Sequence, residues 1–197
     1  MSEAKEVALP QDANQMALDF FQDFEDNFEP TSNGDGTNFL GFSGKSGRYS
    51  LGDDDPAGRL ALFDFTTLKH GYRCWVDGKP VDELVSSKSP KPKKPAGILD
   101  SDGDMCEYKD CYVIKGQMAD GDREDFQFSI DSWGGRSAVE TMLKACRAQA
   151  QSGAAYIFPI VELGEEKMGD EWGNYKPVFS IVNWITPEGE MLEDTGL

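Results

Sequence analysis

Apolar and polar residues alternate over most of the chain between residues 38 and 185, as they do in strands with one buried face. Two short runs, Phe39–Phe42 and Arg48–Leu51, are joined by Gly44 and Gly47 and predict a hairpin. Further strands are expected over 59–65, 72–76, 108–115, 124–131, 156–163 and 176–185. Residues 86–97 are rich in proline and predict an extended loop.

One segment follows a helical period instead. Over residues 137–150, an apolar face is formed by Val139, Met142, Leu143 and Cys146. Ser137 followed three positions later by Glu140 matches a capping box, so the helix is expected to begin there. Several antiparallel strands, one helix and two more strands predict a mainly β domain, an OB-fold-like antiparallel Greek-key barrel with the helix across one end. A generic β-rich α+β domain is the alternative.

Charge divides the chain into three parts. The 197 residues include 36 acidic and 19 basic residues, a net charge of −17. Residues 1–36 hold nine acids and one lysine, and residues 187–197 hold four acids and no base, which leaves 23 acids and 18 bases in 37–186. We therefore predict an acidic N-terminal arm over 1–36, a binding domain over 37–186 and an acidic flexible tail over 187–197.

The N-terminal arm carries its own apolar pattern. An apolar stripe with helical spacing is formed by Met16, Phe20, Phe24 and Phe28, so the arm is expected to be partly helical. It either docks on the domain or binds a partner. The chain has no apolar run long enough for a membrane span and no basic-then-apolar leader, which predicts a soluble protein of the host-cell cytoplasm without membrane partners.

The residues that enzymes need are scarce. His70 is the single histidine, and the sequence lacks a nucleophile elbow, a Walker phosphate loop and a dinucleotide fingerprint, so we expect a protein that is not an enzyme. A zinc site can be drawn from His70, Cys74, Cys106 and Cys111, but its spacings are not those of common zinc knuckles; we expect reduced thiols and no cofactor. A metal-dependent nuclease would need converging carboxylates, for which the candidates are Asp64, Asp110, Asp125 and Asp131.

Binding of single-stranded nucleic acid has more support, because it needs aromatic faces for the bases and Lys or Arg for the backbone. The central region interleaves these residue types. The candidate nucleic-acid-binding residues are Lys45, Arg48, Tyr49, Tyr72, Arg73, Lys88, Lys91, Lys93, Lys94, Trp133, Arg136, Trp172 and Tyr175. Aromatic residues at alternating strand positions are expected to fill the core instead, namely Trp75, Phe126, Phe128, Phe179 and Trp184.

Several short motifs resemble a family of phage and prophage proteins associated with replication and recombination. They span about residues 38–185 and are Gly58-Arg59-Leu60, Trp75-x-Asp77-Gly78-Lys79-Pro80-Val81, Ser132-x-Gly134-Gly135, Pro159-x-Val161-Glu162-Leu163 and Pro177-Val178-Phe179-x-Ile181-Val182-x-Trp184. The architecture is also similar to that of phage single-stranded DNA-binding proteins, whose acidic tails commonly end in an aromatic residue. This chain ends in Thr195-Gly196-Leu197.

Together, the residues and the resemblance predict a single-stranded DNA-binding protein of phage DNA replication or recombination. Its expected partners are single-stranded DNA and, through the acidic ends, replication or recombination proteins; a homodimer is compatible with this. The alternative is an acidic DNA mimic that inhibits a host DNA-binding protein. Its charge, however, lies on the ends rather than as a phosphate-like ladder on the domain.

Overall fold

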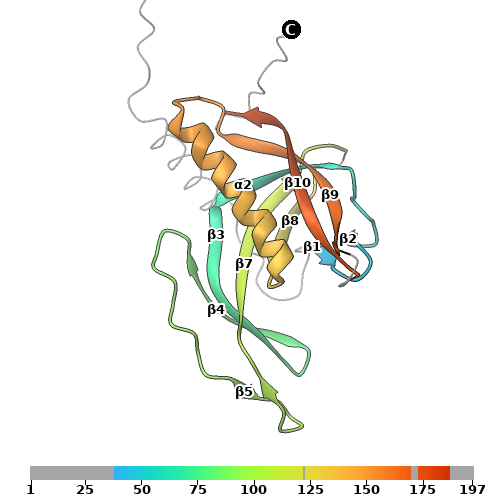
Figure 1. Ribbon diagram of the computed structural model, residues 1–197, viewed down its shortest axis with the longest axis vertical. Coiled ribbons are helices and arrows are strands. Elements are labelled where there is room, and N and C mark those ends of the chain that lie inside the picture. The colour runs from blue at the N-terminus through green and yellow to red at the C-terminus, as the bar shows by residue number, and fades with distance from the viewer. Residues whose placement is uncertain (1–37, 122, 170–172, 187–197) are drawn as a thin grey trace, which may run out of the picture.

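The computed structural model describes residues 38–121, 123–169 and 173–186. These residues form ten strands and one helix (Figure 1). In chain order they are β1 (Asn38–Ser43), β2 (Arg48–Leu51), β3 (Leu60–Val76), β4 (Lys79–Ser86), β5 (Ile98–Leu99), β6 (Met105–Cys106), β7 (Lys109–Met118), β8 (Asp125–Ile130), α2 (Trp133–Gln151), β9 (Phe158–Met168) and β10 (Asn174–Ile185). The predicted acidic arm and tail lie outside the described residues.

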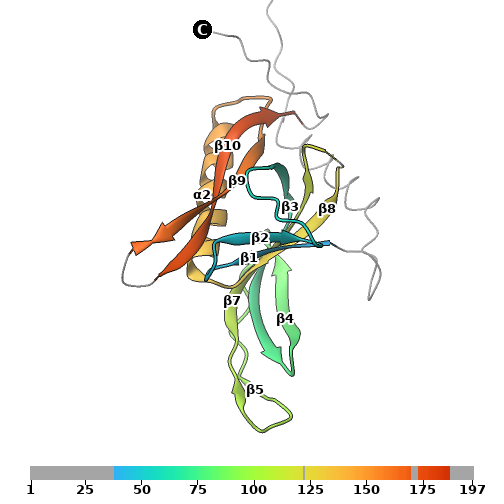
Figure 2. The ribbon, with the colours of Figure 1, turned by 90° about the vertical axis from the view of Figure 1, so that its right-hand side faces the viewer.

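Eight strands form one sheet in the order β10-β9-β3-β7-β8-β1-β2, with β4 paired to β3. The sheet curls into a half-barrel, and α2 packs along β10 (Figures 1 and 2). The prediction of a mainly β domain with one helix is therefore confirmed. The expectation that all strands pair antiparallel is wrong at one place, because β1 runs parallel to β8, with Leu40 opposite Phe128.

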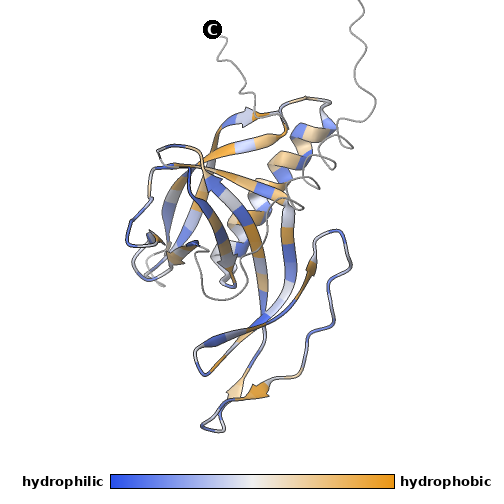
Figure 3. Ribbon diagram, turned by 180° about the vertical axis from the view of Figure 1, so that it is seen from behind, coloured by the Kyte–Doolittle hydropathy of each residue, from blue (hydrophilic) through white to orange (hydrophobic). Residues whose placement is uncertain are grey.

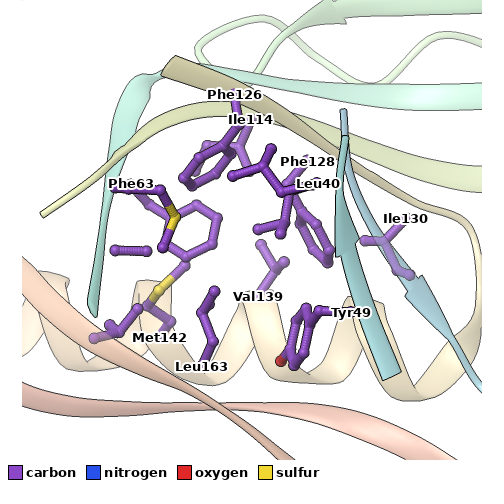
Figure 4. Close-up of a cluster of buried hydrophobic side chains, with 14 of the residues drawn as sticks. Leu40, Tyr49, Phe63, Ile114, Phe126, Phe128, Ile130, Val139, Met142 and Leu163 are labelled. Atoms are coloured by element: carbon purple, nitrogen blue, oxygen red, sulfur yellow. The ribbon is translucent and has the colours of Figure 1, made fainter. Parts of the chain in front are cut away.

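The core lies between the inner face of the sheet and α2 (Figure 4). Phe63 is fully buried, and its ring centroid lies 5.4 Å from that of Phe126, 6.0 Å from that of Phe128 and 5.0 Å from that of Phe179. Val139 and Met142 of the helix are buried against this cluster, as the helical period predicts. Along the strands, polar residues alternate with these apolar ones (Figure 3).

The strand β3 joins two segments that the sequence predicts as separate. Between Asp64 and Lys69 its pairing with β7 shifts register, and side chains take over the backbone hydrogen bonds there. The Asp64 carboxylate accepts from the Thr66 backbone at 2.9 Å, and the Thr67 hydroxyl accepts from the Lys115 backbone at 3.0 Å. The chain can therefore stay extended through this polar stretch, although alternation is lost in the sequence.

Beyond this bulge, β3 leaves the barrel as part of a long projection (Figure 2). We call residues 69–111 the finger; it contains the outer half of β3, β4, the proline-rich loop, β5, β6 and the start of β7. The turn between β3 and β4 is bonded to the turn between β5 and β6. Ser101 donates hydrogen bonds from its backbone N–H and its hydroxyl to the Asp77 carboxylate, at 3.0 and 2.6 Å. The sequence did not predict β4, whose Pro80 lies near its start, where an edge strand tolerates proline.

The helix begins four residues earlier than predicted. Ser132, not Ser137, is its N-cap and accepts from the Gly135 amide at 3.2 Å. The first turn of the helix has glycine at positions 134 and 135 because neighbouring side chains leave no room for a Cβ there. A Cβ on Gly135 would lie 2.0 Å from Ile130 Cγ1, and one on Gly134 would lie 2.8 Å from Lys176 Cβ. The helix α2, which is the one helix among the described residues, is not long and apolar enough to cross a membrane.

Candidate nucleic-acid interface

Three of the predicted residues meet around one carboxylate. Tyr72 of β3 is opposite Asp110 of β7 in the register of the sheet. The Lys91 ammonium pairs with the Asp110 carboxylate and lies 4.7 Å from the centroid of the Tyr72 ring. From the helix, Arg136 Nη1 lies 2.8 Å from the other carboxylate oxygen. We call these four residues the Asp110 cluster; it joins the proline-rich loop, the sheet and the start of α2.

The Asp110 cluster carries a net positive charge. The hydrogen bond from Lys91 is the largest influence on the pKa of Asp110 and lowers it; burial opposes this, and the hydrogen bond from Arg136 lowers the pKa further. At neutral pH two cations therefore face one carboxylate. Arg136 Nε is buried and has no hydrogen-bond partner among the described residues. The cluster thus has positive charge with which to attract an anionic backbone.

An aromatic side chain lies next to this cluster. Trp133 is the first residue of α2 and is 71% exposed, the largest value among the large apolar residues described. It precedes Arg136 by three positions, so both side chains lie on neighbouring parts of the helix surface. An exposed indole beside a cation is the combination that single-strand-binding proteins use for base stacking.

A second group lies at the turn between β1 and β2. Lys45 and Arg48 are exposed there, and Tyr175 packs its ring against Gly47 and donates its backbone N–H to Gly44 O at 2.6 Å. The next residue, Lys176, approaches Gly134 at the start of α2. The helix start therefore has the Asp110 cluster on one side and this second group on the other.

The proline-rich loop is anchored at its beginning. The His70 ring nitrogen Nε2 is 2.9 Å from Ser89 O, and the Ser87 amide donates to Leu68 O at 2.8 Å. The remaining lysines of the loop, Lys88, Lys93 and Lys94, are exposed, and no ion pair between described residues engages them. They can contact phosphates without first breaking a salt bridge.

Two predicted interface residues are buried, so this part of the prediction is corrected. Tyr49 is 3% exposed and points into the core, where its hydroxyl donates to Gly164 O at 2.7 Å and burial raises its pKa (Figure 4). Arg73 is 9% exposed, and its Nε and Nη2 each lie 2.6 Å from an Asp82 carboxylate oxygen. Neither side chain is available to a strand at the surface. Trp172 lies outside the described residues.

Two exposed aromatic residues were missed by sequence reasoning. Trp75 is 52% exposed and Phe39 is 59% exposed, although alternation predicts Trp75 in the core. The available signal was the Asp77-Gly78 turn, since a residue two positions before a turn that projects from the barrel has no core to join. For Phe39 the neighbouring Leu40 takes the buried position.

The four residues of the drawn zinc site are not brought together. Cys111 is opposite Gly71 in register and contacts Ser129, as does Arg73, so Cys111 lies on the same face of the sheet as Arg73. Cys74 follows Arg73 directly and therefore lies on the other face. Among the described residues, no group of three or more His, Cys, Asp or Glu side chains is arranged to hold a metal ion.

Comparison with known proteins finds no matching family model, no matching curated protein and no matching solved structure.

Proposed function

We propose that this protein binds single-stranded DNA without catalysing a reaction, and that it acts in phage DNA replication or recombination. The observation that carries the proposal is the exposed Trp133, which lies at the start of α2 between the Asp110 cluster and the group formed by Lys45, Arg48 and Tyr175. Bases stack on Trp133 and Tyr72, while the loop lysines and Arg136 contact phosphates. Neither contact depends on base sequence.

The chain topology supports an OB-fold for this function. Strands β3, β7 and β8, the helix α2, and strands β9 and β10 follow one another, with β3 pairing with both β7 and β9. This is the order of a five-stranded OB barrel, to which the β1–β2 hairpin is added beside β8. OB-folds bind oligonucleotides with the loops after their first and fourth strands. Here those two connections are the finger and the segment between β9 and β10, which Tyr175 follows.

The test is a titration of a fluorescent oligothymidine and a matched duplex at several salt concentrations. Each phosphate contact contributes about −0.7 to the salt slope for single strands, so we expect a slope of about −2 to −4. The pair Lys93→Ala/Lys94→Ala should reduce its magnitude by about 1.4. The control pair Lys144→Ala/Arg147→Ala removes the same charge from the exposed side of α2 and should change the slope much less.

A second arm tests stacking. Trp133→Ala should weaken binding by about 1–3 kcal/mol through lost stacking. Val182→Ala is the matched control, because Val182 is also an exposed apolar residue, 49% accessible, but lies in the second half of β10, outside the proposed interface. Equal affinity for duplex and single strands, or no binding at low salt, would rule out the proposed function.

A further inference from the structure

Arg73 and Trp75 form an ordered pair on the face of the finger opposite to Tyr72. The Arg73 guanidinium lies over the Trp75 ring, with Cζ 5.8 Å from the ring centroid. About half of the Trp75 surface remains exposed. Arg73 therefore covers part of the Trp75 ring and leaves the rest of the ring accessible to a planar ligand.

Arg73 is held in place from several sides. Asp82, its partner across the β3–β4 ladder, accepts two hydrogen bonds from the guanidinium at 2.6 Å each, and Ser129 of β8 takes a third. The hydrogen bonds that Arg73 donates to Asp82 are also the main reason that the pKa of Arg73 is raised, so the group stays charged. A bidentate guanidinium in this setting has one orientation, which in turn orients the indole beneath it.

The same face of the sheet continues to a second exposed aromatic residue. Ser129 and Gln127 lie two positions apart in β8 and share one face, and Gln127 is opposite Phe39 of β1. The side chains of Arg73, Ser129, Gln127 and Phe39 therefore point to the same side. Counting strands and residues places Phe39 about 30 Å from Trp75.

We propose that Trp75 is a second base-stacking platform, with Arg73 as its positioning residue and Phe39 at the far end of the same face. This rests on the proposed binding of single-stranded DNA. The ligand is an unpaired nucleobase, because a half-exposed indole with a fixed cation on one side offers a flat surface and no sequence-specific hydrogen bonds. Since Tyr72 and Trp75 lie on opposite faces of β3, a strand that reaches both crosses over the finger.

The first experiment measures the affinity of the full chain for oligothymidine. Trp75→Ala should weaken binding about 5- to 150-fold, whereas Trp75→Phe should retain most of the affinity. Val182→Ala, at an exposed apolar position on β10 outside the finger, should leave affinity within about twofold of wild type. Because Trp75 is half exposed, its truncation should not unfold the domain, which thermal unfolding of each variant checks.

The second experiment tests positioning by Arg73. Arg73→Lys keeps the charge but loses the bidentate contact with Asp82. If Arg73 acts through Trp75, adding Trp75→Ala to Arg73→Lys should cost several-fold less affinity than it costs in the wild type. Additive losses would overturn the positioning role, since a merely structural effect of Arg73 is independent of Trp75.

The two proposals fail in different ways. If Trp133→Ala weakens binding and Trp75→Ala does not, the second platform is refuted and the proposed function stands. If the wild-type protein does not bind oligothymidine at low salt, the proposed function is refuted, and this inference with it.

Discussion

If the protein binds single-stranded DNA as proposed, Asp110 competes with the DNA phosphates for the two cations that it pairs with, so its charge should weaken binding. The substitution Asp110→Asn keeps the shape of the side chain and removes the charge. In the wild type, Lys91 and Arg136 share the Asp110 carboxylate, so the three groups have a net charge of +1. In the variant the two cations face the strand with a net charge of +2. We therefore expect Asp110→Asn to bind single-stranded DNA more tightly than the wild type.

The size of the gain follows from the geometry. A phosphate bound to the same two cations would lie about 6 Å from the Asp110 carboxylate, where repulsion is about 0.7 kcal/mol in water and about 1.4 kcal/mol at half that dielectric constant. This corresponds to an affinity gain of about 3- to 10-fold at low salt. Asp110 is 41% exposed, so the Lys91 pair itself adds little to stability.

The pH dependence has a defined sign. Lys91, with help from Arg136, lowers the pKa of Asp110 below its ordinary value. A carboxylate with a lowered pKa stabilises the fold fully above the ordinary value of about 3.9, and this contribution is lost as the pH falls through the lowered pKa. Asp110→Asn should remove this part of the acid dependence of unfolding.

The assay is the oligothymidine titration at about 0.05 M and about 0.3 M salt. The gain in affinity of Asp110→Asn over the wild type should be large at the lower salt concentration and small at the higher one, because salt screens the repulsion. Glu162→Gln removes one charge from an exposed position on β9 and controls for net charge. Unchanged or weaker binding by Asp110→Asn, or an equal gain for Glu162→Gln, would refute the reasoning.

Three further outcomes are expected. Phe63→Ala should lower the free energy of unfolding in urea by about 3–5 kcal/mol, because the ring is fully buried among aromatic neighbours; a loss below about 1 kcal/mol would contradict this core. Gly71→Ala should speed hydrogen exchange of the β4 amides, since φ is 154° and the new Cβ would lie 2.0 Å from Glu83 O; unchanged exchange would show that the finger can adjust. Deleting Pro187–Leu197 should raise the affinity for single-stranded DNA a few-fold, with a gain that shrinks as salt rises through about 0.2 M; no gain at any salt would mean that the tail only keeps the protein soluble.

Local patterns in the sequence were sufficient for most of the secondary structure. The β1–β2 hairpin, the proline-rich loop, the apolar face of α2 and the final strands follow from a period of two, a period of 3.6 or the backbone chemistry of Pro and Gly. Each of these signals acts between residues a few positions apart. Local patterns also show which residues share one face of a strand, as Tyr49 and Leu51 do.

Which face is covered was decided by the tertiary structure. Tyr49 belongs to the buried cluster that also contains Val139 of α2 and Leu163 of β9, whereas Trp75 alternates just as regularly but extends beyond the barrel. Likewise, Arg73 is engaged by Asp82 only because β4 folds back on β3, and Asp110 meets Lys91 and Arg136 only because loop, sheet and helix converge. Burial and charge pairing depend on what lies across the gap between elements, and alternation along one strand carries no information about that.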